Sequence, residues 1–179
     1  MTTSVPVPAP RHAVVVMGAA GAGKSRIGTA LAAALQLPFI EGDAFHPPEN
    51  IALMAAGTPL TDADRHGWLL ALAGELRSAR VASRGVVIAC SALRRRYRDL
   101  LRAGDQSVRF IFLSTDADVL RERLAARRGH YMPASLIDSQ LEALEPPGAT
   151  ERAWTFDARA LPDDIVRDVL HRLQQDGAA

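Results

Sequence analysis

The sequence predicts an α/β fold in which a parallel sheet of about five strands is covered by helices on both faces, giving three layers. Short, continuous apolar runs, typical of strands buried on both faces, alternate along the chain with segments of helical periodicity. This alternation implies right-handed crossovers, which place helices on both faces of the sheet. The chain has 179 residues, of which 48% are hydrophobic and 23% charged. That length and composition suit one globular domain with a substantial core.

The first unit is a strand, a glycine-rich loop and a helix. Residues 13–17, AVVVM, form a continuous apolar run that ends at Gly18. Residues 24–36 carry apolar side chains at helical spacing among strong helix formers. Pro38 ends that pattern, and 39–40 begin a second apolar segment. We therefore expect strand, loop, helix and strand in this order.

The same alternation continues to the carboxyl end. Two insertions interrupt it: 47–83, mostly helical and with Thr61 as the expected cap of its long helix, and 129–148. In open parallel sheets, ligands bind beyond the carboxyl ends of the strands, so functional residues are expected at that edge. The remaining expected elements are strands at 86–89, 109–113 and 154–156, and helices at 92–102, 117–127 and 163–173.

One domain is expected at 13–179, after a flexible proline-containing segment at 1–12. The 21 basic and 20 acidic residues leave a formal net charge of +1, which argues against nucleic acid or a membrane surface as partner. No stretch approaches the roughly 20 apolar residues that span a bilayer, and the amino end lacks the apolar core of a signal peptide. The single cysteine, Cys90, fits a reducing compartment. We therefore expect a cytoplasmic protein.

The strongest functional motif joins the first strand to the first helix. Residues 18–25, GAAGAGKS, match the pattern G-x-x-x-x-G-K-[ST] in the strand–loop–helix context that it requires. The glycines let backbone N–H groups face phosphate oxygens, and the amino end of the helix adds a positive dipole. Lys24, the only lysine in the chain, reaches the β and γ phosphates, and the Ser25 hydroxyl ligates Mg²⁺. The alternative is a chance glycine-rich helix entry. The motif predicts an ATP and Mg²⁺ site made by Gly18, Ala19, Ala20, Gly21, Ala22, Gly23, Lys24 and Ser25.

Two carboxylates follow the second strand. Glu41 and Asp43 are two positions apart, so strand alternation predicts that their side chains point the same way. A carboxylate near the γ phosphate can take the proton of an acceptor hydroxyl, and another can hold a magnesium-bound water. The alternative is a solvated turn with two ordinary acids.

Arginines gather at two further places. Ser91 and an arginine cluster follow the third strand, and Arg94 is the best placed of these arginines because the residues of one helix cannot all face one pocket. A second group lies at the end of the fourth helix, where arginines can close over a triphosphate. Favourable charge at a helix carboxyl end is the alternative explanation. This second group is Arg121, Arg123, Arg127 and Arg128, directly before Gly129.

Taken in order, these motifs resemble the small P-loop gluconate kinases of the thermoresistant type, within the nucleoside-monophosphate-kinase-like superfamily. The resemblance implies ATP-dependent phosphorylation of D-gluconate at its 6-hydroxyl, with 6-phospho-D-gluconate and ADP as products. It also implies a homodimer, a helical substrate-side insertion at 47–83, and a lid with its following segment at 129–148. It spans about 13–173 and rests on the phosphate loop followed by EGD at 41–43, HPPEN at 46–50, GTPLTDADR at 57–65 with Trp68, CSAL at 90–93, YRDLLR at 97–102 and ARRGH at 126–130.

The resemblance also implies roles for residues at matching positions. Lys24, Asp43 and Arg127 would be catalytic, with Asp43 as the base or acceptor-orienting group. Arg127 would be the lid arginine, with Arg123 as a second nucleotide-binding arginine. Glu41 would assist Ser25 at Mg²⁺ through a water. The gluconate site would consist of Asp43, His46, Asn50, Arg65, Ser91 and Arg94, and adenine contacts are expected around 158–162.

Three alternatives remain open from the sequence. Another kinase of this fold, with shikimate or a nucleoside monophosphate as acceptor, shares the phosphate loop, but shikimate kinases have a glycine-rich turn where this chain has CSAL at 90–93. A GTP-dependent switch reads guanine with a lysine, and Lys24 is the only one here. A regulatory module that holds ATP without turnover would lack acceptor-side acids or lid arginines, whereas Asp43, Arg65 and Arg127 are present.

Overall fold

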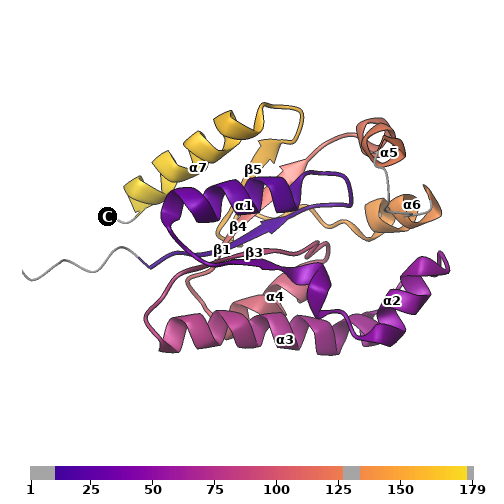
Figure 1. Ribbon diagram of the computed structural model, residues 1–179, viewed down its shortest axis with the longest axis horizontal. Helices are drawn as coiled ribbons and strands as arrows, with labels where there is room; N and C mark the ends of the chain where they lie inside the picture. Colours follow the sequence, from indigo (N-terminus) through magenta and orange to yellow (C-terminus); the bar gives the residue numbers. More distant parts are fainter. Residues whose placement is uncertain (1–10, 127–133, 177–179) are drawn as a thin grey trace, which may run out of the picture.

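The computed structural model describes residues 11–126 and 134–176 (Figure 1). Five strands form one sheet in the order β2-β3-β1-β4-β5, and every pair of neighbours is parallel. The predicted fold class is confirmed. The strands are β1 Ala13–Met17, β2 Phe39–Glu41, β3 Val86–Ala89, β4 Arg109–Ser114 and β5 Ala153–Asp157. The helices are α1 Lys24–Leu35, the 3₁₀ helix η1 Gly42–Phe45, α2 Pro48–Ala55, α3 Asp62–Val81, α4 Arg95–Gly104, α5 Ala117–Ala125, α6 Ala134–Ala143 and α7 Pro162–Asp176.

Strand β1 lies in the middle of the sheet and is buried along its whole length. Val16 pairs with Ala89 of β3 on one side and with Ile111 of β4 on the other. Strands β1 and β3 therefore end within one residue of each other and β4 runs two residues further, so the loops that leave all three start at one edge of the sheet. The sequence predicts the strands but not this order, in which β3 separates β2 from β1.

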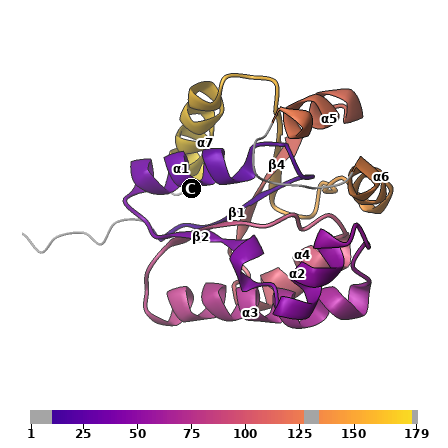
Figure 2. The same cartoon turned by 45° about the vertical axis from the view of Figure 1, so that its right-hand side comes forward.

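Helices cover both faces of the sheet, with α1 and α7 on one face and α3 and α4 on the other (Figures 1 and 2). Successive residues of a strand point to opposite faces. Accordingly, Val14 and Val16 pack in the core beneath α1 and α7, and Val15 and Met17 pack in the core above α3 and α4. Helices α2, α5 and α6 lie around the edge at which β1 leads into α1 (Figure 1).

The helix expected at 92–102 begins later, at Arg95. Ala92 has a left-handed φ of +43° and Arg94 is extended, with φ −99° and ψ 149°, so neither can start a helix. The helix expected at 117–127 ends at Ala125, and the last helix is longer than the expected 163–173. Sequence periodicity locates helices well and their ends poorly, because local contacts decide where a helix stops.

The predicted cap of the long insertion helix is confirmed. The Thr61 hydroxyl accepts from the Asp64 N–H, and the Asp64 carboxylate accepts from the Thr61 N–H in return, which forms a capping box. The insertion at 47–83 contains α2 and α3, and the described part of 129–148 contains α6. Among the helices of residues 11–126 and 134–176, none has the length and apolarity needed to cross a bilayer.

Candidate active site

The phosphate loop has the backbone that its glycines allow. Gly18, Gly21 and Gly23 have φ values of +142°, +84° and +98°, which L-residues with side chains rarely adopt. A Cβ on Gly18 would also lie 2.7 Å from the Leu113 carbonyl oxygen. Gly23 caps α1 without a side-chain hydrogen bond, and the first turn of α1 carries no acidic residue. The helix therefore begins with backbone N–H groups and positive dipole directed at the loop, as an anion site requires.

The charged and hydroxyl side chains of the motif open helix α1. Lys24 is half-buried, and its Nζ donates to the Ala19 carbonyl oxygen at 3.1 Å, which folds the side chain back along the loop. Ser25 is exposed one position further on. The ammonium group and the hydroxyl therefore both lie at the end of the helix where an anion would bind.

A small cavity of about 50 Å³ adjoins the loop and collects most of the predicted acceptor residues. Lys24, Asp43, His46, Arg65 and Ser91 all line it, although they come from four separate segments. Helix α6 contributes to the same cavity. The other lining residues are Ala20, Met54, Pro59, Leu60, Leu136, Ser139 and Gln140.

A larger cavity of about 570 Å³ lies beside the small one, and Arg65 lines both. Its other charged residues include Arg94, Asp62 and Glu142. A cavity of this size can take a small polar molecule, whereas the small cavity alone cannot. The two together form a site that runs from the phosphate loop outward between α3, the β3–α4 loop and α6.

Asp43 reaches this site by a route that strand alternation does not predict. Strand β2 ends at Glu41, and Gly42–Phe45 form the 3₁₀ helix η1, so Glu41 and Asp43 are not two alternating residues of one strand. Gly42 packs so tightly that a Cβ there would lie 2.3 Å from the Ala89 carbonyl oxygen. Trp68 Nε1 donates to the Gly42 carbonyl oxygen at 2.7 Å and fixes the turn. Asp43 lines the small cavity, whereas Glu41 is not among the residues that line either cavity.

His46 and Asn50 form a buried support for the acceptor site. The His46 ring stacks on Trp68, with ring centroids 4.1 Å apart. Asn50 Nδ2 lies 3.3 Å from His46 Nδ1 and donates to the Asp64 carbonyl oxygen at 2.8 Å. Burial lowers the pKa of His46, against the opposing effect of the Asp43 charge, so the imidazole is neutral at pH 7. Asn50, 4% exposed, therefore holds His46 in place and is not among the residues that line the two cavities.

Sequence reasoning missed Asp62 and Tyr97 as members of the site. The Asp62 carboxylate accepts a hydrogen bond from the Tyr97 hydroxyl and forms ion pairs with Arg96 at 2.6 Å and Arg94 at 3.4 Å. The Tyr97 hydrogen bond lowers the pKa of Asp62, assisted by the arginines. In the sequence, Asp62 looks like an ordinary first-turn acid. Its partner Tyr97 lies 35 positions further along the same chain, so the local sequence does not indicate their contact.

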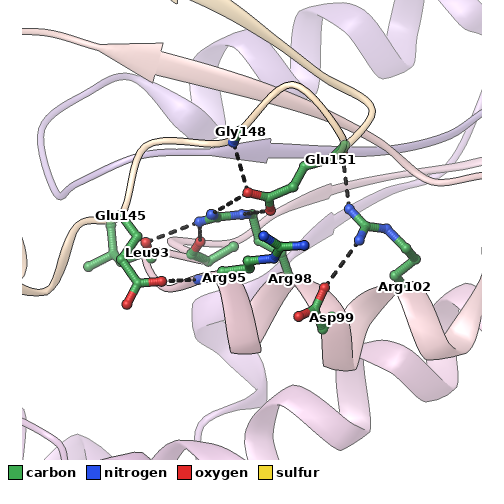
Figure 3. Close-up of polar contacts among 9 residues, drawn as sticks. Leu93, Arg95, Arg98, Asp99, Arg102, Glu145, Gly148 and Glu151 are labelled. Atoms are coloured by element: carbon green, nitrogen blue, oxygen red, sulfur yellow. Dashed lines mark hydrogen bonds and ion pairs between the residues drawn. The ribbon is translucent and has the colours of Figure 1, made fainter.

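A buried ion pair holds the loop that carries Ser91 and Arg94 (Figure 3). Arg98 and Glu151 are 0% and 2% exposed, and two nitrogens of Arg98 donate to the two carboxylate oxygens of Glu151 at 2.6 and 3.0 Å. Arg98 Nη1 also donates to the carbonyl oxygens of Ala92 and Leu93 at 3.0 and 3.1 Å. Burial acts to raise the pKa of Glu151, but hydrogen bonds from Arg98 and from the Gly148 N–H bring it below its usual value.

Glu145 makes a second connection to the same loop. Its backbone N–H donates to the Leu93 carbonyl oxygen at 2.9 Å, and its carboxylate accepts from the Arg95 N–H at 2.7 Å, at the start of α4 (Figure 3). The segment that follows α6 is thereby attached to the β3–α4 loop at two places.

A third cavity, of about 400 Å³, lies on the other side of the phosphate loop. Gly21, Gly23 and Arg123 line it together with 158–162, the segment in which adenine contacts are expected. Arg123 donates to the Ala158 carbonyl oxygen at 2.7 Å, which links α5 to that segment. The position beside the loop glycines is where a nucleoside attached to loop-bound phosphates would lie.

The two arginines of the second group that the structure describes, both on α5, do not lie together. Arg121 pairs with Asp118 at 3.0 Å and with Asp138 of α6 at 2.6 Å, on the exposed surface between α5 and α6, and only Arg123 of this group borders the nucleotide-side cavity within the described residues. Arg127, Arg128 and the following Gly129 lie outside the described residues.

Comparisons with known proteins identify the family to which the chain belongs. A sequence profile of the shikimate kinase family matches residues 20–158. A gluconokinase from Gluconobacter oxydans is 44% identical over 161 residues, which cover 90% of each protein. The chain belongs to the gluconokinase family. The family resemblance predicted from the ordered motifs is confirmed.

Two further members of the family are similar over most of the chain. The thermoresistant gluconokinase of Escherichia coli is 43% identical over 140 residues, which cover 78% of this chain and 80% of that one. A crystal structure of a gluconokinase from Sinorhizobium meliloti matches with a TM-score of 0.83 and 46% identity, covering 93% of this chain and 94% of the other. The match to the shikimate kinase profile reflects the P-loop kinase fold that the gluconokinases share with that family.

Proposed function

We propose that the protein transfers the γ-phosphoryl group of ATP to the 6-hydroxyl of D-gluconate and releases 6-phospho-D-gluconate and ADP. The observation that carries this proposal is that Lys24 of the phosphate loop and Asp43, Arg65 and Ser91 of the acceptor side line one cavity. The similarity to gluconokinases over nine-tenths of the chain supports the choice of acceptor.

The lining of the two cavities suits a polyol carboxylate. Arg65 lies in both cavities and Arg94 in the larger one, and guanidinium groups bind a carboxylate through paired hydrogen bonds. Asp43 and Ser91, nearer the phosphate loop, offer the acceptors and donors that hydroxyl groups need. This arrangement favours a substrate with its charged end outward and its terminal hydroxyl at Lys24.

In the transfer step, Asp43 orients the 6-hydroxyl and takes its proton as the new O–P bond forms. The bond between the γ phosphorus and the β–γ bridging oxygen breaks, and ADP leaves with that oxygen. Lys24 and the loop N–H groups neutralise charge on the phosphate oxygens. Closure of the site excludes water, which would otherwise accept the phosphoryl group.

Mg²⁺ and the lid complete the proposal. The amino end of α1 fits a magnesium nucleotide, because Ser25 is exposed beside Lys24 and no acid lies in the first turn to compete with the phosphates for the backbone N–H groups. Ser25 would hold Mg²⁺, with Glu41 acting through a water, and the ion supplies charge neutralisation at the β and γ phosphates. Arg127 would close over the triphosphate, with Arg123 beside it. A cytoplasmic homodimer is the expected form.

A coupled ADP-release assay tests the function. With Mg²⁺ and ATP, we expect turnover with D-gluconate and only background rates with shikimate, AMP, glucose or no acceptor. Turnover of another acceptor in place of gluconate would contradict the acceptor assignment and leave the phosphate-loop chemistry intact. Background rates with every acceptor would favour a regulatory module that holds ATP without turning it over.

A further inference from the structure

The side chain of Gln140 on helix α6 contacts the phosphate loop. The Ala20 N–H, in the third position of the loop, donates to Oε1 of Gln140 at 2.8 Å. Both residues line the small cavity together with Lys24 and Asp43. The two partners are 120 positions apart in the chain, so this hydrogen bond joins the segment that follows the lid to the loop that holds the phosphates.

Helix α6 is also one wall of the acceptor site. It supplies Leu136, Ser139 and Gln140 to the small cavity, and Ser139 also lines the larger one, together with Glu142. Its apolar side packs away from the cavities, since Ile137 is 2% exposed in the core shared with α1 and α7. The position of this wall relative to the phosphate loop sets how closely the acceptor hydroxyl can approach the γ phosphate.

An ion pair between α6 and α5 is weak by comparison. Arg121 of α5 reaches Asp138 at 2.6 Å, but both side chains are about half exposed, and such surface ion pairs contribute little. The Gln140 hydrogen bond is partly buried and ends on the backbone of the loop itself. It therefore fixes α6 against the one segment whose geometry the reaction requires.

We propose that Gln140 is a positioning residue for the acceptor, which docks α6 onto the phosphate loop and so closes the site against water. This inference rests on the proposed function and deepens it. A carboxamide suits the position because its oxygen accepts from the loop N–H while the group carries no charge. A carboxylate would accept the same hydrogen bond but would repel the phosphates bound beside it.

The first variant is Gln140→Met, which keeps the length of the side chain and removes the acceptor. We expect the KM for gluconate to rise about fivefold, the factor that one neutral hydrogen bond supplies. The dissociation constant for ADP should stay within about twofold of the wild-type value, since the loop glycines and Lys24 are unchanged. ATP hydrolysis by water, relative to gluconate phosphorylation, should increase, because the wall no longer closes.

The second variant is Gln140→Glu, which keeps an acceptor oxygen. Hydrogen exchange of the phosphate-loop peptide should be faster than wild type in Gln140→Met and unchanged in Gln140→Glu, because only the first loses the contact. Gln140→Glu should instead raise the KM for ATP through charge repulsion. Gln174→Met, an exposed glutamine of α7, is the matched control and should behave as the wild type in every assay.

A Gln140→Met protein with wild-type gluconate KM, wild-type loop protection and no added hydrolysis would overturn the proposal. A variant that loses only thermal stability, with unchanged kinetics, would also overturn it, because that is the result of a merely structural role. If the wild-type protein does not phosphorylate gluconate, the proposed function fails by itself. Loop protection and ADP binding would then still decide whether Gln140 docks α6.

Discussion

The phosphate loop and the acceptor wall, which consists of η1, the amino end of α3, the β3–α4 loop and α6, are built in different ways. The loop is formed by eight consecutive residues, and its shape depends on backbone conformations at Gly18, Gly21 and Gly23. The acceptor wall is assembled from distant segments by buried side-chain contacts, such as Arg98 with Glu151, 53 positions apart, and Trp68 with Gly42, 26 positions apart. Changes in the loop should therefore remove chemistry and leave the fold, whereas changes behind the wall should weaken both stability and gluconate binding.

The largest effect is expected from Lys24→Ala. Removal of the ammonium group leaves charge on the β and γ phosphates unneutralised, so kcat should fall by about a thousandfold or more. The melting temperature should be nearly unchanged, because Lys24 is only half-buried at the amino end of α1 and outside the hydrophobic core. The coupled assay and a thermal melt measure both quantities. Lys24→Arg keeps the charge in a different shape, so its kcat should lie between those of the wild type and Lys24→Ala. A loss of kcat of about tenfold or less in Lys24→Ala would contradict the assigned role of the loop.

Asp43→Asn should give the next largest loss. Without a carboxylate to take the hydroxyl proton, kcat should fall by about a hundredfold to ten-thousandfold. Nucleotide affinity should stay within about twofold, because the loop is not altered. Steady-state kinetics and nucleotide titration make the measurement, with Asp163→Asn, an exposed acid of α7, as the control. A kcat within about twofold of wild type would show that Asp43 is not the base.

Substitution of the buried pair of Arg98 and Glu151 tests whether this pair supports the acceptor wall. Arg98→Met leaves Glu151 buried and unpaired, which should lower the free energy of unfolding by about 3–5 kcal/mol. The carbonyls of Ala92 and Leu93 also lose their donor, so the KM for gluconate should rise while ADP affinity is retained. Urea denaturation and steady-state kinetics measure these effects.

Two controls sharpen the test of the buried pair. Arg167→Met, which removes the exposed pair with Asp164, should change little. The double variant with Glu151→Met should be more stable than Arg98→Met alone, because no buried charge is left unpaired. A stable Arg98→Met protein with unchanged gluconate KM would contradict the assigned support of the β3–α4 loop.

The smallest effect is a dependence of stability on pH through His46. Its pKa in the folded protein lies below the unfolded value of 6.5, so below pH 6.5 the unfolded chain binds more protons than the folded one. The free energy of unfolding should therefore fall as the pH decreases from about 7 through the lowered pKa of His46. Urea denaturation between pH 7.5 and pH 5.5 measures this slope. His46→Gln should flatten it, with the part due to His12, whose pKa burial also lowers, remaining; an unchanged slope would exclude His46 as its source.

The same contrast explains what the sequence could predict. The phosphate loop is a local motif, so its residues and the strand and helix on either side are readable from spacing alone. The start of the helix expected at residue 92 is wrong because Ala92 takes a left-handed conformation held by Arg98, a buried contact that periodicity cannot indicate. Strand alternation predicts Asp43 near the phosphate loop, and Asp43 does line a cavity with Lys24, but the turn at Gly42 is what places it there.

The residues that the sequence did not predict were missed for one common reason. Asp62, Tyr97, Gln140 and Glu151 each act through a partner far away in the chain. Taken alone they look like a first-turn acid, a helix aromatic, a helix amide and a surface carboxylate. The strand order was also not predictable, because the position of β3 between β1 and β2 depends on the packing of the whole sheet.

The position of Trp68 makes it an intrinsic fluorescent probe of the acceptor site. Its buried indole stacks on His46 and donates to the carbonyl of Gly42, the residue next to Asp43. The other tryptophan, Trp154, lies on β5 against Arg109, outside both acceptor cavities. Because the chain has two tryptophans, Trp154→Phe leaves Trp68 as the sole indole. Its emission then reports directly on the site, so arrival of the sugar acid can be followed as a change in fluorescence without any added label.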